Sequence, residues 1–110
     1  MKHSHIVVFG SLNMDLLAQT SRLPLAGETI TGDKFQMIPG GKGANQAIAV
    51  SRLGIPCRMV GRVGKDSFGE TLLHSLQKND VDTTGVLMNE SAHTGVAMIT
   101  VNRSEERRVG

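Results

Sequence analysis

The pattern of apolar and polar positions predicts strands of two kinds. Residues 6–10 form a continuous apolar run ending in glycine, which is typical of a parallel strand buried on both faces. Further apolar runs at 57–64, 86–88 and 95–101 predict three more strands. Residues 16–38 instead roughly alternate between polar and apolar and contain several turn residues. This stretch predicts a small, half-exposed antiparallel β unit.

Two helices are predicted between these strands. An alanine-rich segment at 43–53 ends at Gly54 and Pro56, and its small or core-facing side chains share one face: Ala44, Ala47, Ile48 and Ser51. A second helix runs to about Asn79, with Ser67 as N-cap and Glu70 reaching back in a capping box. Three leucines of this helix are expected to face the core, namely Leu72, Leu73 and Leu76. The element order predicts an α/β layer with a β excursion inserted early.

Composition narrows the range of partners. The chain has 110 residues, which is enough for one domain. Aromatic residues make up 3%, with no Trp or Tyr, so stacking platforms for single-stranded nucleic acid are not expected. The net charge of +2 is too small for a protein that binds a phosphate backbone, and three of the twelve basic residues lie in the last eight positions. No nucleic-acid partner is predicted.

The sequence gives no indication of a disulfide, a metal site, a signal peptide or a membrane span. Cys57 is the only cysteine and forms no intrachain disulfide or multi-cysteine metal site, and the four histidines lack metal-ligand spacing. The first apolar run is too short for a signal-peptide core, and no stretch approaches the length of a membrane span. We expect a cytoplasmic enzyme with no membrane partner and no metal site within this chain.

Polar side chains follow the first predicted strand. Asn13 and Asp15 lie two residues apart, so in extended chain they point to the same side. Ligands of open α/β sheets bind outside the carboxyl ends of the strands, and an amide beside a carboxylate suits adjacent sugar hydroxyls. The alternative is an Asx turn in which both side chains cap their own backbone, and spacing alone favours that alternative.

A glycine-rich segment, 40–46, precedes the first predicted helix. Its glycines let backbone N–H groups converge at the positive end of a helix. It is not a nucleotide P-loop, because Gly43 follows Lys42 where Ser or Thr is required, and the dinucleotide-binding pattern fails at Gln46. Two interpretations stay equally open: a glycine-walled pocket with Lys42 and Asn45 as polar groups, or a helix entry that needs glycine for backbone reasons.

Four segments together resemble the ribokinase family of sugar kinases (PfkB type). They are Gly-Ser-Leu-Asn-Met-Asp at 10–15, Pro-Leu-Ala-Gly-Glu-Thr at 24–29, Gly-Gly-Lys-Gly-Ala-Asn-Gln-Ala at 40–47 and Val-Gly-Lys-Asp-Ser-Phe-Gly at 63–69. Their order and separations match the family through about Asn102. The resemblance implies a doubly wound α/β sheet, incomplete at its C-terminus, with the early β excursion as a small lid over the sugar.

The resemblance also implies a site and a reaction. Asn13 and Asp15 would hold sugar hydroxyls, and the same sugar would be enclosed by Gly41, Lys42, Gly43, Ala44 and Asn45. The reaction implied is transfer of the ATP γ-phosphoryl group to a primary hydroxyl, with Mg²⁺ and K⁺, and the glycine segment favours ribose. The family's catalytic Asp and its ATP and K⁺ sites lie further along the chain. No catalytic, cofactor-binding or metal residue is therefore assigned, and the fragment alone is expected to be inactive.

Other functions remain open at this point. Another kinase of the same family would act on fructose, a sugar acid or a nucleoside. A non-catalytic sugar-binding fragment and the non-functional product of an incomplete gene are further alternatives. A downstream Gly-x-Gly-Asp segment would identify the parent as a kinase. The resemblance also implies a homodimer that forms through the lid.

The last eight residues depart from the family pattern. Residues 103–110 read Arg-Ser-Glu-Glu-Arg-Arg-Val-Gly and can be back-translated into a common sequencing adapter. We therefore expect residues 1–102 to be the natural sugar-binding part with its lid, and 103–110 to be a non-native tail without regular structure. The alternative is a genuine charged surface loop.

Overall fold

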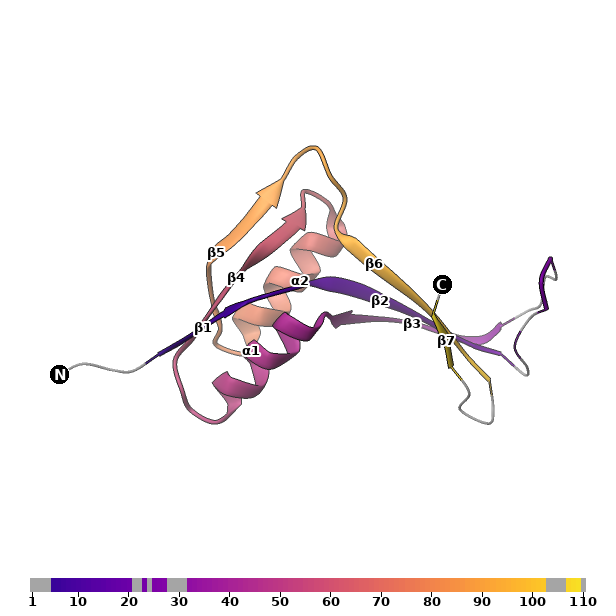
Figure 1. Ribbon diagram of the computed structural model, residues 1–110, viewed down its shortest axis with the longest axis horizontal. Coiled ribbons are helices and arrows are strands. Elements are labelled where there is room, and N and C mark those ends of the chain that lie inside the picture. Colours follow the sequence, from indigo (N-terminus) through magenta and orange to yellow (C-terminus); the bar gives the residue numbers. More distant parts are fainter. Residues whose placement is uncertain (1–4, 21–22, 24, 28–31, 103–106, 110) are drawn as a thin grey trace. The chain divides into compact units, whose positions relative to one another are not determined.

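The computed structural model describes residues 5–20, 23, 25–27, 32–102 and 107–109 (Figure 1). The chain divides into two compact units, each built from two stretches of sequence. The first unit comprises Met1–Met14 and Pro39–Gly95, and the second comprises Asp15–Ile38 and Val96–Gly110.

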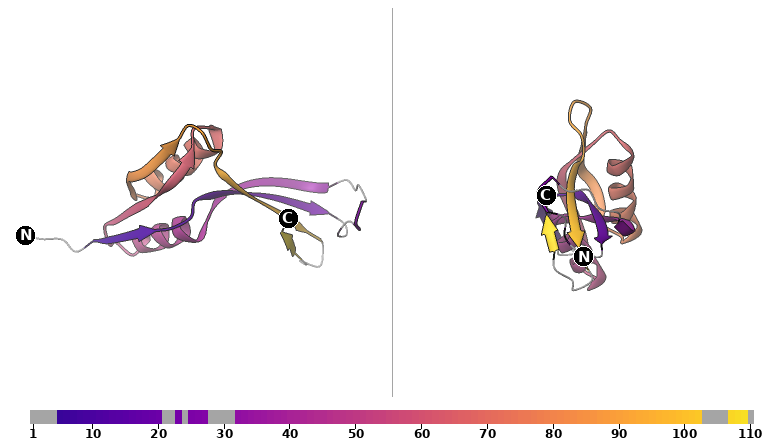
Figure 2. Two further views of the ribbon diagram at one scale, coloured as in Figure 1. Left: turned by 45° about the horizontal axis from the view of Figure 1, so that its top comes forward. Right: turned by 90° about the vertical axis from the view of Figure 1, so that its right-hand side faces the viewer.

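The first unit is an α/β layer. Its parallel sheet has the strand order β1-β4-β5, formed by β1 (Ile6–Phe9), β4 (Cys57–Gly64) and β5 (Asp82–Asn89). The helices α1 (Lys42–Arg52) and α2 (Ser67–Lys78) contact each other and lie on the same face of this sheet (Figures 1 and 2). The predicted α/β class and the predicted order of helices and strands are confirmed.

The core of this unit lies between the sheet and the two helices. Ala47 and Met59 are fully buried, and Leu72 and Leu76 of α2 are almost so. Small side chains at Ala44 and Ala47 let α1 approach the sheet closely, as predicted. The other predicted inward residues, Ile48, Ser51 and Leu73, are half-buried.

The prediction that the first strand is buried on both faces is wrong. Only Val8 is buried, whereas Ile6 and Val7 are 40% exposed and Phe9 is 76% exposed. The reason is that β1 is an edge strand and the helices cover one face of the sheet. The strand register places Phe9 and Leu87 on the opposite face, where both remain largely exposed.

Helix α1 ends as its sequence predicts. Its last turn is closed by N–H groups of Leu53 and Gly54, which donate to Val50 and Ser51 carbonyls at 3.1 and 2.9 Å. Gly54 has φ +83°, a conformation that glycine adopts without strain. Pro56 follows before β4 begins.

Helix α2 begins differently from the prediction. The N-cap is Asp66, not Ser67: Asp66 has extended backbone angles and its carboxylate accepts from the Gly69 N–H at 2.8 Å. Ser67 is already helical, and its carbonyl accepts from the Thr71 hydroxyl. The N3 position is therefore Gly69, so Glu70 does not complete a capping box.

The second unit is centred on a four-stranded sheet with the order β3-β2-β6-β7. Its strands are β2 (Asn13–Thr20), β3 (Gly32–Gly40), β6 (Gly95–Val101) and β7 (Arg107–Val109). The predicted early β unit is confirmed, although β2 begins at Asn13 rather than at residue 16. Ala26 and Gly27 form a predicted turn, whereas the predicted turn and strand residues at 28–31 lie outside the described residues.

Strand β7 was not predicted. It pairs antiparallel with β6, with Val109 opposite Ile99 and Arg107 opposite Val101. The expectation that the tail has no regular structure is therefore wrong for residues 107–109. Residues 103–106 and 110 lie outside the described residues.

Candidate functional site

The carboxyl end of β1 meets the N-terminus of α1 through glycines. A side chain added at Gly43 would place its Cβ 2.7 Å from the Gly10 Cα and 2.8 Å from the Ser11 nitrogen. A Cβ added at Gly41, which has φ +101°, would lie 2.5 Å from the Ser11 carbonyl oxygen. These distances leave no room for a side chain. The backbone explanation for the glycines therefore holds at Gly41 and Gly43.

Backbone hydrogen bonds join the same two segments. The Ala44 N–H donates to the Ser11 carbonyl at 3.1 Å, and the Asn45 N–H donates to the Gly41 carbonyl at 2.9 Å. The Gly10 N–H donates to the Val60 carbonyl of β4 at 3.2 Å. The fold thus brings together residues 10–12 and 41–45, which the sequence placed in two separate candidate motifs.

The side chains of this junction are polar and accessible. Lys42 and Asn45 are exposed and lie three residues apart in the first turn of α1, so they are neighbours on the helix surface. Gly43 and Ala44 are buried. Because α1 begins here, the partial positive charge of a helix N-terminus adds to the charge of Lys42.

Asn13 and Asp15 lie in strand β2 and not in a turn. Both are half-buried, and Met14 between them is 1% exposed. Alternation along a strand puts the Asn13 and Asp15 side chains on the same face of β2. Asn13 belongs to the first unit, whereas Asp15 is the first residue of the second. The predicted pair therefore stands where the chain passes from one unit to the other.

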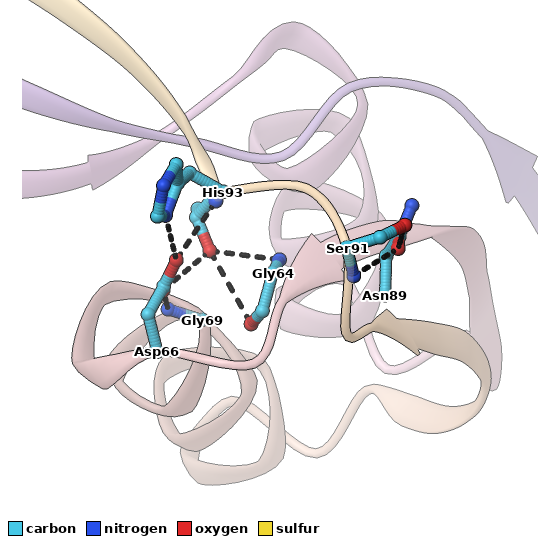
Figure 3. Close-up of polar contacts among 7 residues, drawn as sticks. Gly64, Asp66, Gly69, Asn89, Ser91 and His93 are labelled. Atoms are coloured by element: carbon cyan, nitrogen blue, oxygen red, sulfur yellow. Dashed lines mark hydrogen bonds and ion pairs between the residues drawn. The ribbon is translucent and has the colours of Figure 1, made fainter.

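A polar cluster that sequence reasoning missed lies at the carboxyl end of β4. Figure 3 shows Asp66 with Gly64, Gly69 and His93 around it, and all of these contacts involve residues of the first unit. Hydrogen bonds from Thr94 and Gly69, with a smaller contribution from His93, lower the pKa of Asp66 to about 2. The sequence signal was present but ambiguous, because Asp66 and Ser67 are both good N-cap residues.

Because the pKa of Asp66 is lowered, the hydrogen bonds that it accepts from Thr94 and Gly69 weaken only at low pH. Its pKa is lower in the folded state than the ordinary value of about 3.9. The bonds therefore contribute their full stability above about pH 4 and lose it as the pH falls towards 2. At neutral pH the carboxylate is ionised and accepts every hydrogen bond offered to it.

Other chemistry is sparse in the described part of the chain. No group of three or more His, Cys, Asp or Glu side chains among the described residues could hold a metal ion. Cys57 is a free, buried thiol whose pKa is raised by burial. Within the same residues, no helix has the length and apolar character needed to cross a membrane.

Comparison with known proteins identifies the family. Residues 3–110 match the pfkB family carbohydrate kinase model. The chain is 45% identical over 105 residues to a ribokinase of Lactococcus lactis subsp. lactis, covering 93% of this chain and 34% of that protein. It is 47% identical over 111 residues to a ribokinase of Schizosaccharomyces pombe, covering 96% of this chain and 35% of that protein.

A solved structure agrees with this result. Arabidopsis thaliana ribokinase, complexed with ribose and ATP, superposes with a TM-score of 0.89 at 32% identity. The match covers 99% of this chain and 36% of that one, so the chain spans about a third of the length of its relatives. The glycine junction, the parallel sheet and these matches together show that the chain belongs to the pfkB family of carbohydrate kinases.

Proposed function

We propose that the protein containing this chain transfers the γ-phosphoryl group of ATP to the primary hydroxyl of ribose. The observation that carries the proposal is the glycine junction between residues 10–12 and 41–45, in a chain whose relatives are ribokinases. The Arabidopsis ribokinase that shares this fold binds ribose and ATP, which supports the same pair of substrates here.

Each candidate residue then has a role in holding the sugar. Asn13 and Asp15 hold ribose hydroxyls through their amide and carboxylate groups. Lys42 and Asn45 contribute an ammonium and an amide from the first turn of α1. The run from Gly41 through Gly43 and Ala44 closes around the same sugar, while its glycines let the backbone pack against residues 10–12.

The nucleotide and the cations belong to the remainder of the protein. We propose that residues beyond this chain hold ATP, Mg²⁺ and K⁺ and supply the catalytic Asp. Bound metal ions would neutralise charge on the phosphates, as in other phosphoryl transfers. Residues of this chain bind and orient the sugar hydroxyls and carry out no proton transfer. Because ATP is the donor, we place the reaction in the cytoplasm.

The proposal is tested with the full-length protein and a panel of ribose, deoxyribose, fructose, a sugar acid and a nucleoside. ATP-dependent ADP release is expected to show the highest kcat/KM with ribose. The isolated 110-residue chain is expected to show no turnover and poor solubility, because Phe9 and Leu87 and the sheet edges are exposed. Preferential phosphorylation of another compound would assign the protein to a different branch of the family.

We further propose that the full-length protein is a homodimer that associates through the sheet of the second unit. Among the side chains that the structure describes, the exposed large apolar ones of that sheet are Phe35, Met37, Ile38, Val96 and Met98. Phe35→Glu is expected to convert a dimer into a monomer in analytical ultracentrifugation. Leu53→Glu changes a residue of the first unit that is 78% exposed and is the matched control. A monomeric wild-type protein, or equal effects of the two variants, would contradict the proposal.

We propose, finally, that the natural segment is 1–102 and that residues 103–110 are a tail of non-native origin. The support is the back-translation of this octapeptide into an adapter sequence. Nucleotide reads across these codons provide the check. Codons that differ from the adapter, or the same octapeptide in an independently assembled genome, would show that the tail is natural.

A further inference from the structure

The Asp66 carboxylate holds Thr94 through two hydrogen bonds. Its Oδ2 accepts from the Thr94 N–H at 2.9 Å, and its Oδ1 accepts from the Thr94 hydroxyl at 2.6 Å and from the Gly69 N–H at 2.8 Å (Figure 3). The Thr94 hydroxyl in turn accepts from the Gly64 N–H at 2.9 Å. Thr94 is 4% exposed, so its backbone and side chain are both fixed in a buried position.

Close packing removes any remaining freedom around Thr94. A Cβ added at Gly64 would collide with the Thr94 nitrogen and the Ala92 carbonyl oxygen. A Cβ added at Gly69 would collide with the Gly64 carbonyl oxygen and lie 3.0 Å from the Thr94 Oγ1. Thr94 is therefore closely packed against Gly64 and Gly69, and close-packed interiors resist small displacements.

The connection from β5 to Thr94 is also held in place. The Lys65 N–H donates to the Asn89 carbonyl at 3.0 Å, and the Lys65 Nζ lies 3.2 Å from the Glu90 Oε1. The Asn89 side chain accepts from the Ser91 N–H and hydroxyl, each at 2.9 Å (Figure 3). Thr94 thus stands at the end of a connection that is attached to the first unit at several points.

The residue after Thr94 lies beside Asn13 of the candidate sugar site. Gly95 begins β6, and a Cβ added to it would lie 3.5 Å from the Asn13 Cβ and 3.7 Å from the Leu12 carbonyl oxygen. A Cβ at position 95 would therefore be in van der Waals contact with the Asn13 Cβ, so Gly95 lies beside Asn13, whose strand β2 neighbours β6 in the sheet. Because Gly95 directly follows Thr94 in the chain, a displacement of Thr94 moves the backbone that lies next to Asn13.

We propose that Asp66 is a positioning residue for sugar binding, acting through Thr94 and Gly95 on Asn13. The inference rests on the proposed function, because it assigns Asn13 to the sugar. Asp66 itself touches no substrate. Its N-cap bond to Gly69 accounts for one of its three hydrogen bonds, and the two bonds to Thr94 hold the residue that precedes Gly95.

Three substitutions test this role, and one of them, Thr94→Val, separates it from helix capping. In Asp66→Asn one carboxylate oxygen becomes an NH₂ group, which must face a donor because every partner of Asp66 in the cluster donates. Thr94→Val keeps the shape of residue 94 and removes its hydroxyl, leaving the Asp66–Gly69 cap in place. Thr94→Ser retains the hydroxyl and is the conservative variant expected to restore wild-type behaviour.

The chain supplies a matched control in Asp82. Its Oδ1 accepts from the Thr84 N–H at 2.9 Å and from the Thr84 hydroxyl at 2.7 Å, which reproduces the chemistry of the Asp66–Thr94 pair. Asp82 begins β5, opposite Arg58 near the start of β4, and therefore lies at the other end of the sheet from Asp66. Asp82→Asn perturbs a carboxylate that accepts from the same two donor types in an exposed setting, where its Oδ2 also pairs with the Arg58 Nε at 3.2 Å, and it does so without approaching Asn13.

Steady-state kinetics of the full-length enzyme test the proposal. Asp66→Asn and Thr94→Val are expected to raise KM for ribose roughly tenfold, with KM for ATP close to wild type. Thr94→Ser and Asp82→Asn are expected to leave both values close to wild type. An unchanged KM for ribose in Asp66→Asn, or an equal rise in Asp82→Asn, would overturn the proposal.

A second measurement does not depend on the substrate. The side-chain amide NMR signals of Asn13 are expected to shift in Asp66→Asn and to stay in place in Asp82→Asn. Unshifted Asn13 signals in Asp66→Asn would refute the positioning role whatever the enzyme phosphorylates. A wild-type enzyme that phosphorylates no sugar, with Asn13 signals that do shift, would instead refute the proposed function alone.

Discussion

Replacing Asp15 by alanine in the full-length protein is expected to reduce kcat/KM for ribose by roughly 10²- to 10⁴-fold. A carboxylate can accept hydrogen bonds from two sugar hydroxyls. Each bond to a charged group contributes about 1.5–3 kcal/mol, and each 1.4 kcal/mol is about tenfold in affinity. Asp15 lies in β2 close to Asn13 and is half-buried. In Asp15→Ala, water therefore compensates poorly for the hydrogen bonds that the sugar hydroxyls lose.

The effect of Asp15→Ala should fall on the sugar and not on the nucleotide. We expect KM for ATP to change little, because the nucleotide is proposed to bind residues beyond this chain. Asp82→Ala is the control, since it removes an exposed carboxylate at the start of β5. Isothermal titration of ribose with each variant separates lost binding from lost turnover. Unaltered ribose binding and turnover in Asp15→Ala would remove Asp15 from the site.

Gly43→Ala is expected to damage both the stability of the protein and its use of ribose. The new methyl group would lie 2.7–2.8 Å from backbone atoms of Gly10 and Ser11, which cannot move aside as a side chain can. Overpacking costs roughly 1–3 kcal/mol, and a chain of this protein's full size loses about 2–4 °C in Tm for each kcal/mol. To relieve the clash, α1 must shift away from residues 10–12.

A shift of α1 also moves the two polar side chains of its first turn. Lys42 and Asn45 precede and follow Gly43, so a displacement approaching 1 Å is expected to lower kcat/KM for ribose by about 100-fold. Thermal unfolding and steady-state kinetics measure the two losses.

Gly54→Ala is the control: it introduces strain at φ +83° but its new methyl group meets no atom within 4 Å. It should lower Tm modestly and leave kcat/KM for ribose unchanged. A Gly43→Ala enzyme with normal Tm and kinetics would show that the junction tolerates a side chain.

The α/β class and the order of the elements could be predicted from the amino-acid sequence alone. Helix α1 was predicted to within a residue at each end, and the bounds of β4 and β6 were predicted correctly. These features follow from local causes: the spacing of apolar residues, the stop at Gly54 and the alternation in the early β unit. The candidate residues of the sugar site were also named from the sequence, because their motifs resemble those of the ribokinase family.

Features that join residues distant in the chain could not be predicted from the sequence and are seen only in the folded structure. Which of Asp66 and Ser67 caps α2 depended on which side-chain oxygen reaches the Gly69 N–H, and Asp66 also binds Thr94, 28 positions away. Periodicity gave no indication that Gly10 must be a glycine because Gly43 packs against it. The exposure of Phe9 depended on β1 being an edge strand with helices on one face of the sheet. Local sequence patterns indicate which secondary structure a segment forms. The contacts above form only when separate segments pack together, because the free energy that favours them comes from the close fit of atoms far apart in the chain.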